Sequence, residues 1–222
     1  MRKPGFIARQ GRKPSGLLGQ IVAHVMAKET ADENNVAVEL LQLQPDDAVL
    51  EIGCGHGETL AKCANAVSRG LLCGIDFSSV MHRHAIRRHR RLVAKKRIEF
   101  HLGSSDRLPF NDKSFDRTFA VHTIYFWNAA LDHLAEAHRV LKPGGRFVLG
   151  FRPAEDLGFR ATFPGEIYHI RPEAEIVQLV RDAGFEVSDL RRHIRGFLQL
   201  SFVVTTREPE QGRQTEAAGT QS

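Results

Sequence analysis

The chain has 222 residues, of which 42% are hydrophobic and 26% charged, and its net charge is +5 at neutral pH. This composition is that of an ordinary globular protein and excludes collagen-like and disordered chains. No apolar run approaches the roughly 18–20 residues that span a bilayer, and the basic start lacks the apolar segment of a secretory signal. Three cysteines without a C-x-x-C pair argue against a disulfide framework, so we expect a cytoplasmic protein.

The first part of the chain is expected to stand apart from the main domain. Residues 1–16 are rich in Arg, Lys, Gly and Pro without periodicity, which predicts a basic, flexible arm. Apolar residues at helical spacing predict an N-terminal helical lid over 17–44, with a first helix from Leu17. Within it, Thr30 followed by Glu33 is typical of a capping box that opens a second helix. At the other end, the polar residues 208–222 are expected to form a disordered tail.

Residues 45–207 alternate between predicted strands and helices. The expected strands are 49–52, 70–76, 98–102, 115–121 and 146–150, and the helices between and after them are 57–67, 78–96, 131–141 and 173–183. Such alternation predicts a parallel sheet covered on both faces. Two last strands, 185–190 and 197–206, are too close for a crossover and should pair antiparallel. We therefore expect an α/β, Rossmann-like, doubly wound fold with a seven-stranded mixed sheet, and an insertion or lid over 152–172.

A glycine-rich loop follows the first expected strand, in the segment Glu51-Ile52-Gly53-Cys54-Gly55-His56-Gly57. Glycines between a strand and a helix let the backbone turn tightly and approach a ligand closely. The spacing differs from the dinucleotide fingerprint, and no P-loop is present. Asp76, at the end of the next strand, suits both hydroxyls of a ribose. An acid at Glu51 would repel a pyrophosphate but suits a ligand with an ammonium group.

A nucleoside without phosphates and with a cationic amino-acid tail is S-adenosylmethionine (SAM). Here the chain resembles the class I SAM-dependent methyltransferases, and among them the small-molecule group that includes the ubiquinone/menaquinone methyltransferases. The resemblance runs from about 49 to 206 and rests on four blocks in order, V-L-E-I-G-C-G-H-G (49–57), G-I-D-F-S (74–78), L-P-F-N-D-K-S-F-D (108–116) and L-K-P-G-G-R-F-V-L (141–149). It implies methyl transfer from SAM to a small, aromatic or apolar acceptor, with S-adenosylhomocysteine as product.

The resemblance also implies the cofactor site. The glycine loop would lie under the methionine part with Glu51 towards its amino group, and Asp76 would hold the ribose. Phe77 and Met81 would sandwich the adenine, although an alternative assigns Met81 to the helix core. Where relatives place an acid for the adenine, this chain has Gly103-Ser104-Ser105, with Asp106 as a substitute. The expected cofactor-binding residues are Glu51, Gly53, Cys54, Gly55, Gly57, Asp76, Phe77, Met81, Ser104, Ser105 and His122.

The fourth strand ends in a segment that would lie beside the methyl donor, His122-Thr123-Ile124-Tyr125-Phe126-Trp127. Tyr125 and Trp127, with Tyr168 of the insertion, are predicted to wall the acceptor pocket. Alternatively, Phe126 and Trp127 pack the following helix. His122 is a candidate general base and Tyr125 a second catalytic candidate. Alternatively His122 contacts the cofactor only through its backbone, and catalysis rests on positioning without a base. The three cysteines are expected to be buried and inert, and no metal site is expected.

Arginines and lysines crowd the predicted helix between residues 82 and 97. A solvated outer face is the favoured interpretation, and a grip on RNA phosphates or on an anionic membrane surface is the alternative. An RNA base methyltransferase is accordingly the second functional hypothesis, although the end of strand four lacks the [D/N]-P-P-[Y/F] of amino-methylating enzymes. A SAM-binding protein without catalysis is the third. The expected partner is a small-molecule acceptor rather than nucleic acid, and no oligomeric state is indicated.

Overall fold

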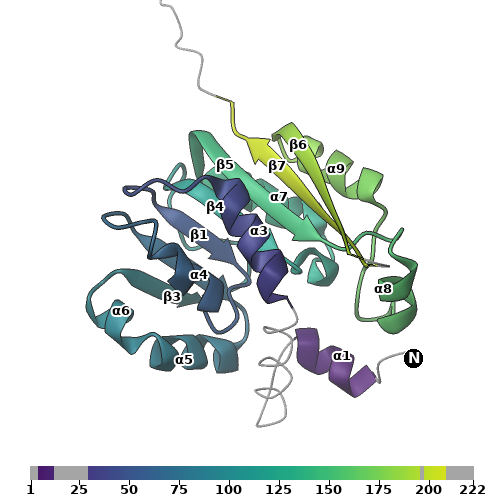
Figure 1. Ribbon diagram of the computed structural model, residues 1–222, viewed down its shortest axis with the longest axis horizontal. Helices are drawn as coiled ribbons and strands as arrows, with labels where there is room; N and C mark the ends of the chain where they lie inside the picture. Colours follow the sequence, from purple (N-terminus) through teal and green to yellow (C-terminus); the bar gives the residue numbers. More distant parts are fainter. Residues whose placement is uncertain (1–4, 13–29, 196–197, 209–222) are drawn as a thin grey trace, which may run out of the picture.

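A seven-stranded sheet forms the centre of the structure, a computed structural model that describes residues 5–12, 30–195 and 198–208 (Figure 1). Its strands are β1 (Val49–Ile52), β2 (Leu72–Asp76), β3 (Ile98–Leu102), β4 (Phe115–Val121), β5 (Leu141–Phe151), β6 (Glu186–Arg195) and β7 (Leu198–Thr206). In space they follow the order β3-β2-β1-β4-β5-β7-β6, and only β7 runs antiparallel to its neighbours. The predicted doubly wound, mixed α/β sheet is therefore confirmed.

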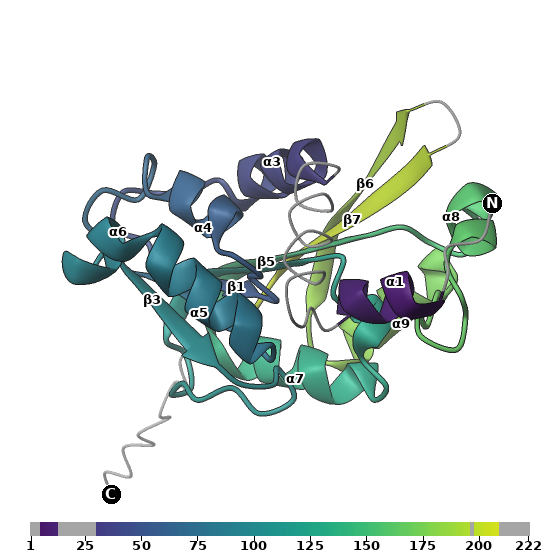
Figure 2. The ribbon, with the colours of Figure 1, turned by 90° about the horizontal axis from the view of Figure 1, so that it is seen from below.

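Helices cover both faces of the sheet (Figure 2). The helical elements are α1 (Gly5–Arg12), α3 (Ala31–Leu41), α4 (Glu58–Cys63), α5 (Ser79–Arg88), α6 (Arg90–Ala94), η1 (Ile124–Phe126), α7 (Ala130–Val140), α8 (Leu157–Thr162) and α9 (Glu173–Asp182). One core layer joins the sheet to α3 and α4, and the other joins it to α7 and α9. None of the described helices has the length and apolar composition needed to cross a membrane.

Strands β1 and β2 lie in the interior of the sheet. All of their residues are buried, as expected for parallel strands with helices on both sides. Both strands nevertheless contain an acid near the carboxyl end, Glu51 in β1 and Asp76 in β2. The first two residues of the loop after β1 are fixed to β2, because the backbone N–H groups of Gly53 and Cys54 donate to the carbonyl of Ile75 at 2.8 and 3.1 Å. The fold thus brings two buried carboxylates together at one edge.

The N-terminal region departs from its prediction. Part of the expected flexible arm is helical, since α1 occupies residues 5–12 and buries Ala8, whereas the helix expected from Leu17 lies outside the described residues. α3 is also less separate than a lid, because Ala37 and Leu41 belong to the core against the sheet. The expected capping box is wrong, because the side chain of Thr30 makes no cap hydrogen bond and Glu33 is engaged elsewhere. Composition alone conceals these tertiary contacts.

Two further boundaries differ for local reasons. The expected helix 78–96 divides at His89, whose side-chain Nε2 bonds the carbonyl of His56 at 3.1 Å. The Lys142-Pro143-Gly144-Gly145 segment was expected to separate helix from strand, yet β5 begins at Leu141 directly after α7. The segment is held in the sheet because Gly144 N–H donates to the carbonyl of Arg207 at 2.8 Å. The expected insertion contains α8, and the tail from 209 lies outside the described residues.

Phe119 in the middle of β4 is fully buried against the layer that contains α3. We expect Phe119→Ala to lower the free energy of unfolding by about 3–5 kcal/mol, because it removes buried apolar surface and leaves a cavity. Urea denaturation measures the change. The same truncation at Phe6, which is 58% exposed, is the control and should cost little. Equal losses in the two variants would contradict the assigned core.

Candidate functional site

A cavity of about 450 Å³ opens at the carboxyl ends of β1, β2 and β4. This is the edge at which open α/β sheets bind ligands, and the volume lies in the range of small-molecule sites. Its walls come from the glycine loop after β1, from the end of β2 with the start of α5, and from the segments that follow β3 and β4. Arg12 of α1 lines it as well. The cavity therefore collects the segments that the sequence singled out.

The glycine loop depends on the absence of side chains. Gly53, Gly55 and Gly57 all have positive φ, at 76°, 52° and 76°. A Cβ on Gly53 would lie 2.2 Å from Cγ2 of Thr123, so only glycine allows β1 and β4 to close at this point. Gly57 differs from its prediction, because it is not among the lining residues and instead packs beneath the ring of Phe100. Packing against Phe100 therefore requires glycine at position 57.

Glu51 and Asp76 give the cavity its charge character. Both are buried, and neither has a Lys or Arg partner within the described parts of the chain. Asp76 accepts hydrogen bonds from the backbone N–H of Gly55 at 2.9 Å and of Ser78 at 2.8 Å. Oε2 of Glu51 is buried without a hydrogen bond. A buried carboxylate oxygen without a partner is costly, so the cavity is suited to a cationic or hydrogen-bond-donating ligand.

Burial raises the pKa of both acids. For Glu51 burial is the largest cause, the backbone N–H of Leu60 opposes it, and the charge of Asp76 adds to it. For Asp76 burial again raises the pKa, and the backbone donors Ser78 and Gly55 oppose it. Desolvation disfavours the charged form of a carboxyl group, and a nearby like charge does the same. A ligand ammonium group would reverse this penalty.

A second part of the cavity has serines and aromatic rings. Ser104 and Ser105 both line it, together with Asp106. Ser105 Oγ lies 2.7 Å from Nδ1 of His133, whose ring stacks on Trp127 at 4.9 Å between centroids. The predicted residues Phe77 and Met81 line the cavity too, Phe77 with 39% of its surface exposed and Met81 buried. The adenine contacts therefore remain a prediction that the geometry permits.

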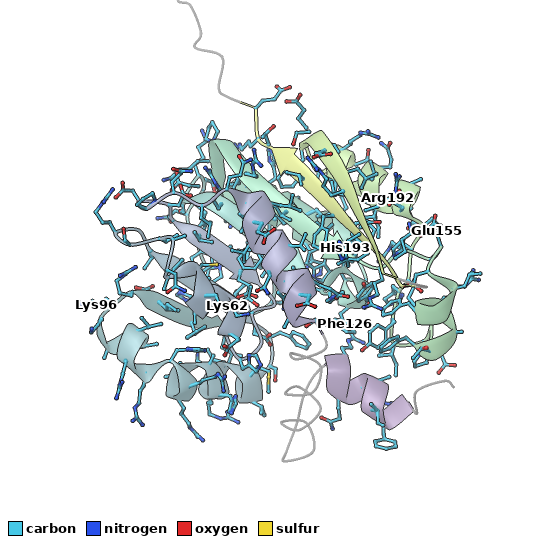
Figure 3. The ribbon with its side chains drawn as sticks, viewed as in Figure 1. Lys62, Lys96, Phe126, Glu155, Arg192 and His193 are labelled. Carbon is cyan, nitrogen blue, oxygen red and sulfur yellow. The ribbon has the colours of Figure 1, made fainter. Side chains whose placement is uncertain are left out.

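The aromatic residues after β4 divide into two groups. Phe126 and Trp127 line the cavity, and Figure 3 places Phe126 at the foot of α3. Tyr125 and Tyr168 are also buried but are not lining residues, which corrects their expected place in the pocket wall. Their ring centroids lie 5.9 Å apart, in an aromatic cluster in which Tyr168 also contacts Phe126. Both side chains belong to the hydrophobic core.

His122 lies in a polar network that the sequence did not reveal. Its Nε2 contacts a carboxylate oxygen of Glu33 in α3, and its Nδ1 lies 3.2 Å from the hydroxyl of Tyr125. That hydroxyl accepts from the backbone N–H of Arg152, whose guanidinium pairs with Glu33. Both ring nitrogens are thus engaged although His122 lines the cavity, and its φ of 58° holds it in the left-handed region. We call Glu33, His122, Tyr125 and Arg152 the α3 network.

The network sets the ionisation of Glu33. Burial raises the pKa of this carboxyl group, but the hydrogen bond from His122 and the charges of His122 and Arg152 outweigh it and lower the pKa from 4.5 to about 2. Glu33 is therefore ionised at neutral pH and bridges α3 to the ends of β4 and β5. Other residues that sequence reasoning missed are Arg12, Asn34, Asn128 and His133, all of which line the cavity. Single polar residues in helices and loops have no sequence signal of their own.

The three cysteines are buried, as expected. Burial raises the pKa of Cys63 and of Cys73 to about 12, and burial also raises that of Cys54 well above its ordinary value, so the thiols are protonated and unreactive. Cys73 is also part of the one group of potential metal ligands in the described ranges, with Glu99 and His101, whose ligand atoms lie within 4.8 Å of one another. His101 Nε2 there faces Glu99 Oε2 at 3.6 Å.

Comparison with known proteins agrees with this geometry. A family model described as "Methyltransferase domain" matches residues 50–149. A putative methyltransferase of Haloferax volcanii in complex with the Trm112 activator has the same fold, with a TM-score of 0.71 and 20% identity over 84% of this chain and 93% of that one. Residues 50–149 therefore form a methyltransferase domain.

Curated relatives match different shares of their own length. "Putative methyltransferase YrhH" of Bacillus subtilis is 28% identical over 74% of this chain and 83% of its own. The "Demethylmenaquinone methyltransferase" of Symbiobacterium thermophilum is 35% identical over 47% of this methyltransferase and 42% of its own length. An "Uncharacterized 37.1 kDa protein in transposon TN4556" of Streptomyces fradiae is 38% identical over 52% of this chain, which spans only 33% of that protein.

The α3 network predicts a pH-dependent contribution to stability. A carboxyl group with a lowered folded pKa stabilises the fold above its unfolded pKa, near 4.5, and loses this contribution as the pH falls through about 2. Glu33→Gln should therefore lower the free energy of unfolding by about 3–4 kcal/mol at neutral pH, since one pKa unit corresponds to about 1.4 kcal/mol.

Denaturation of wild type and variant from neutral pH down to acid measures this difference, which should shrink as the pH falls from 4.5 towards 2. Glu39→Gln is the control, because Glu39 is exposed in the same helix. A difference between wild type and Glu33→Gln that stays constant over this pH range would contradict the ionised bridge.

Proposed function

We propose that this methyltransferase binds SAM in the cavity and transfers its methyl group to a small, aromatic or apolar acceptor. The observation that favours this most is the buried, unpartnered Oε2 of Glu51 beside the buried carboxylate of Asp76. A ligand with an ammonium group and a ribose satisfies both acids, whereas a pyrophosphate would be repelled by them. The residues present therefore fit SAM.

Each part of the ligand has a partner in this proposal. Glu51 takes the amino group, and Gly53 and Gly55 leave room for the methionine chain. Asp76 takes the ribose hydroxyls, because each of its oxygens uses one lone pair on a backbone donor and keeps another. Phe77 and Met81 enclose the adenine ring, and Ser104, Ser105 and Asp106 surround its polar edge. His122 contributes a wall.

SAM, when bound, supplies an electrophilic methyl group on a sulfonium ion. The task of the chain is then to hold the acceptor atom in line with that methyl group and to keep water away. Phe126 and Trp127 offer an apolar and aromatic wall next to this position. The demethylmenaquinone methyltransferase among the relatives supports a small-molecule acceptor. We expect the aromatic wall to select an apolar acceptor by shape and stacking.

His122 and Tyr125 act in this proposal through the α3 network. Nε2 of His122 contacts Glu33 and Nδ1 lies 3.2 Å from the hydroxyl of Tyr125, so both ring nitrogens are engaged within the network and neither is free for the acceptor. A general-base role for either residue stays a prediction that requires this network to open. Catalysis by positioning fits the geometry without opening of the network.

His122→Gln should leave the shape of the pH–rate profile unchanged, and loss of one limb of the profile would identify His122 as the base.

The cofactor assignment predicts the effect of Asp76→Asn. Calorimetric titration with SAM should show affinity weakened by about 1–3 kcal/mol, roughly 5- to 150-fold, because charged hydrogen bonds to the ribose are lost. Asp182→Asn, on the exposed surface of α9, is the control. Thermal denaturation of both variants separates lost binding from lost folding. Unchanged affinity in folded Asp76→Asn would exclude the ribose assignment.

The acceptor assignment predicts different effects for two aromatic residues. In methyl-transfer assays with an acceptor found by screening apolar aromatic compounds, Trp127→Ala should raise the acceptor KM by about 10-fold or more, which corresponds to about 1.4 kcal/mol of lost contact. The KM for SAM should stay unchanged. Tyr168→Phe should change neither constant, because Tyr168 lies outside the cavity. If Tyr168→Phe raised the acceptor KM and Trp127→Ala did not, the acceptor would bind beside Tyr168 and the assignment would be wrong.

A further inference from the structure

The outer side of α5 and α6 carries a strongly basic surface that the methyl-transfer site does not use. We call the exposed residues Arg83, Arg87, Arg90, Arg91, Lys95 and Lys96 the basic stripe. No Asp or Glu occurs between Asp76 and Glu99. Figures 1 and 2 show α5 and α6 along the outside of β3, at one edge of the sheet, and Figure 3 shows Lys96 pointing away from the molecule.

The basic stripe is not neutralised from within. Its neighbours are engaged, since Arg88 pairs with Glu58 at 2.7 Å and Arg97 donates to the carbonyl of Val67. The side chains of the six stripe residues form no ion pair or hydrogen bond with any residue that the structure describes. Arg83 and Arg87 are four apart in one helix, where like charges destabilise each other. An external anionic partner would relieve this repulsion.

An exposed apolar side chain lies on an element that borders the same side of the molecule as the stripe. Phe6 is 58% exposed on α1, the helix whose Arg12 lines the cavity. Figure 1 shows α1 and α5 along the same side of the molecule. Basic residues beside exposed aromatic residues are the combination by which a protein surface binds a bilayer interface.

We propose that the basic stripe, together with Phe6, docks this protein on the surface of an anionic lipid bilayer. The lysines and arginines would contact the anionic headgroups, and the phenyl ring of Phe6 would enter the boundary with the acyl chains. This inference rests on the proposed function in one respect, because docking would present the cavity to an apolar acceptor dissolved in the lipid.

The observations favour a bilayer over a nucleic acid as the anionic partner. Proteins that bind single-stranded nucleic acids stack the bases on aromatic side chains within a positively charged groove. The segment from Ser78 to Glu99 contains no Phe, Tyr or Trp. The exposed phenyl ring of Phe6 lies instead on α1, outside the stripe.

Flotation of the full-length protein with lipid vesicles tests the proposal. Vesicles of phosphatidylcholine with phosphatidylglycerol should bind the protein, vesicles of phosphatidylcholine alone should not, and added salt should weaken binding by screening. Arg83→Glu with Arg87→Glu should weaken binding by about 10-fold or more, because each Lys or Arg near an anionic surface contributes about a factor of five. Lys95→Glu with Lys96→Glu is a second variant at the end of α6.

The control is Arg181→Glu with Arg191→Glu, which changes the net charge equally near β6 at the opposite edge of the sheet. It should bind vesicles like wild type. Phe6→Ser should weaken vesicle binding without any change in charge. Calorimetric titration of each variant with S-adenosylhomocysteine should match wild type, which separates failure of docking from failure of the proposed cofactor site.

Two results would overturn the proposal. One is the absence of binding to anionic vesicles, or binding that both stripe variants retain. The other is retention of RNA on filters that the stripe variants lose and Phe6→Ser keeps, in a protein that does not float with vesicles. That second result would assign the stripe to a nucleic acid.

Discussion

Burial of two carboxylates at neighbouring strand ends is the constraint on which the site depends. Glu51 pairs with Gly74 of β2, two residues before Asp76, and the described chain offers the two acids backbone donors but no basic side chain in ion-pair contact. Desolvation of both acids, and the charge of Asp76 near Glu51, oppose ionisation. These two acids are the reason for proposing a cationic ligand that can donate hydrogen bonds.

The second constraint is the attachment of α3 to this cavity. Glu33 reaches from the first turn of α3 to His122 and Arg152, at the ends of two adjacent strands. Buried ion pairs of this kind specify one geometry, and removing one partner is costly. The network fixes His122 with positive φ and thereby positions the start of the segment with Phe126 and Trp127. The proposed acceptor wall of Phe126 and Trp127 is thus positioned by a helix that lies far away in the sequence.

Sequence patterns predicted the sheet because its signals are local and repeated. Continuous apolar strands, glycine after β1 and acids at the strand ends each follow from residues within a few positions. The α3 network escaped prediction because Glu33 and His122 are 89 residues apart, and because Thr30 with Glu33 matches a capping box that the fold does not form. Gly57 shows the same limit, since its φ was predictable but its packing beneath Phe100 was not. Tyr125 and Tyr168 could not be distinguished from Trp127, because aromatic residues in a core and in a pocket wall have the same composition.

The central claim is that Glu51 recognises an ammonium group while Asp76 recognises a ribose. Calorimetric titration with S-adenosylhomocysteine and with adenosine tests it most directly, because the two ligands share the ribose and adenine but only the first has the amino acid. The account predicts that wild type binds S-adenosylhomocysteine about 10-fold or more tightly than adenosine, and that Glu51→Gln removes most of this difference. Equal affinity of wild type for the two ligands, or no binding of either, would contradict it.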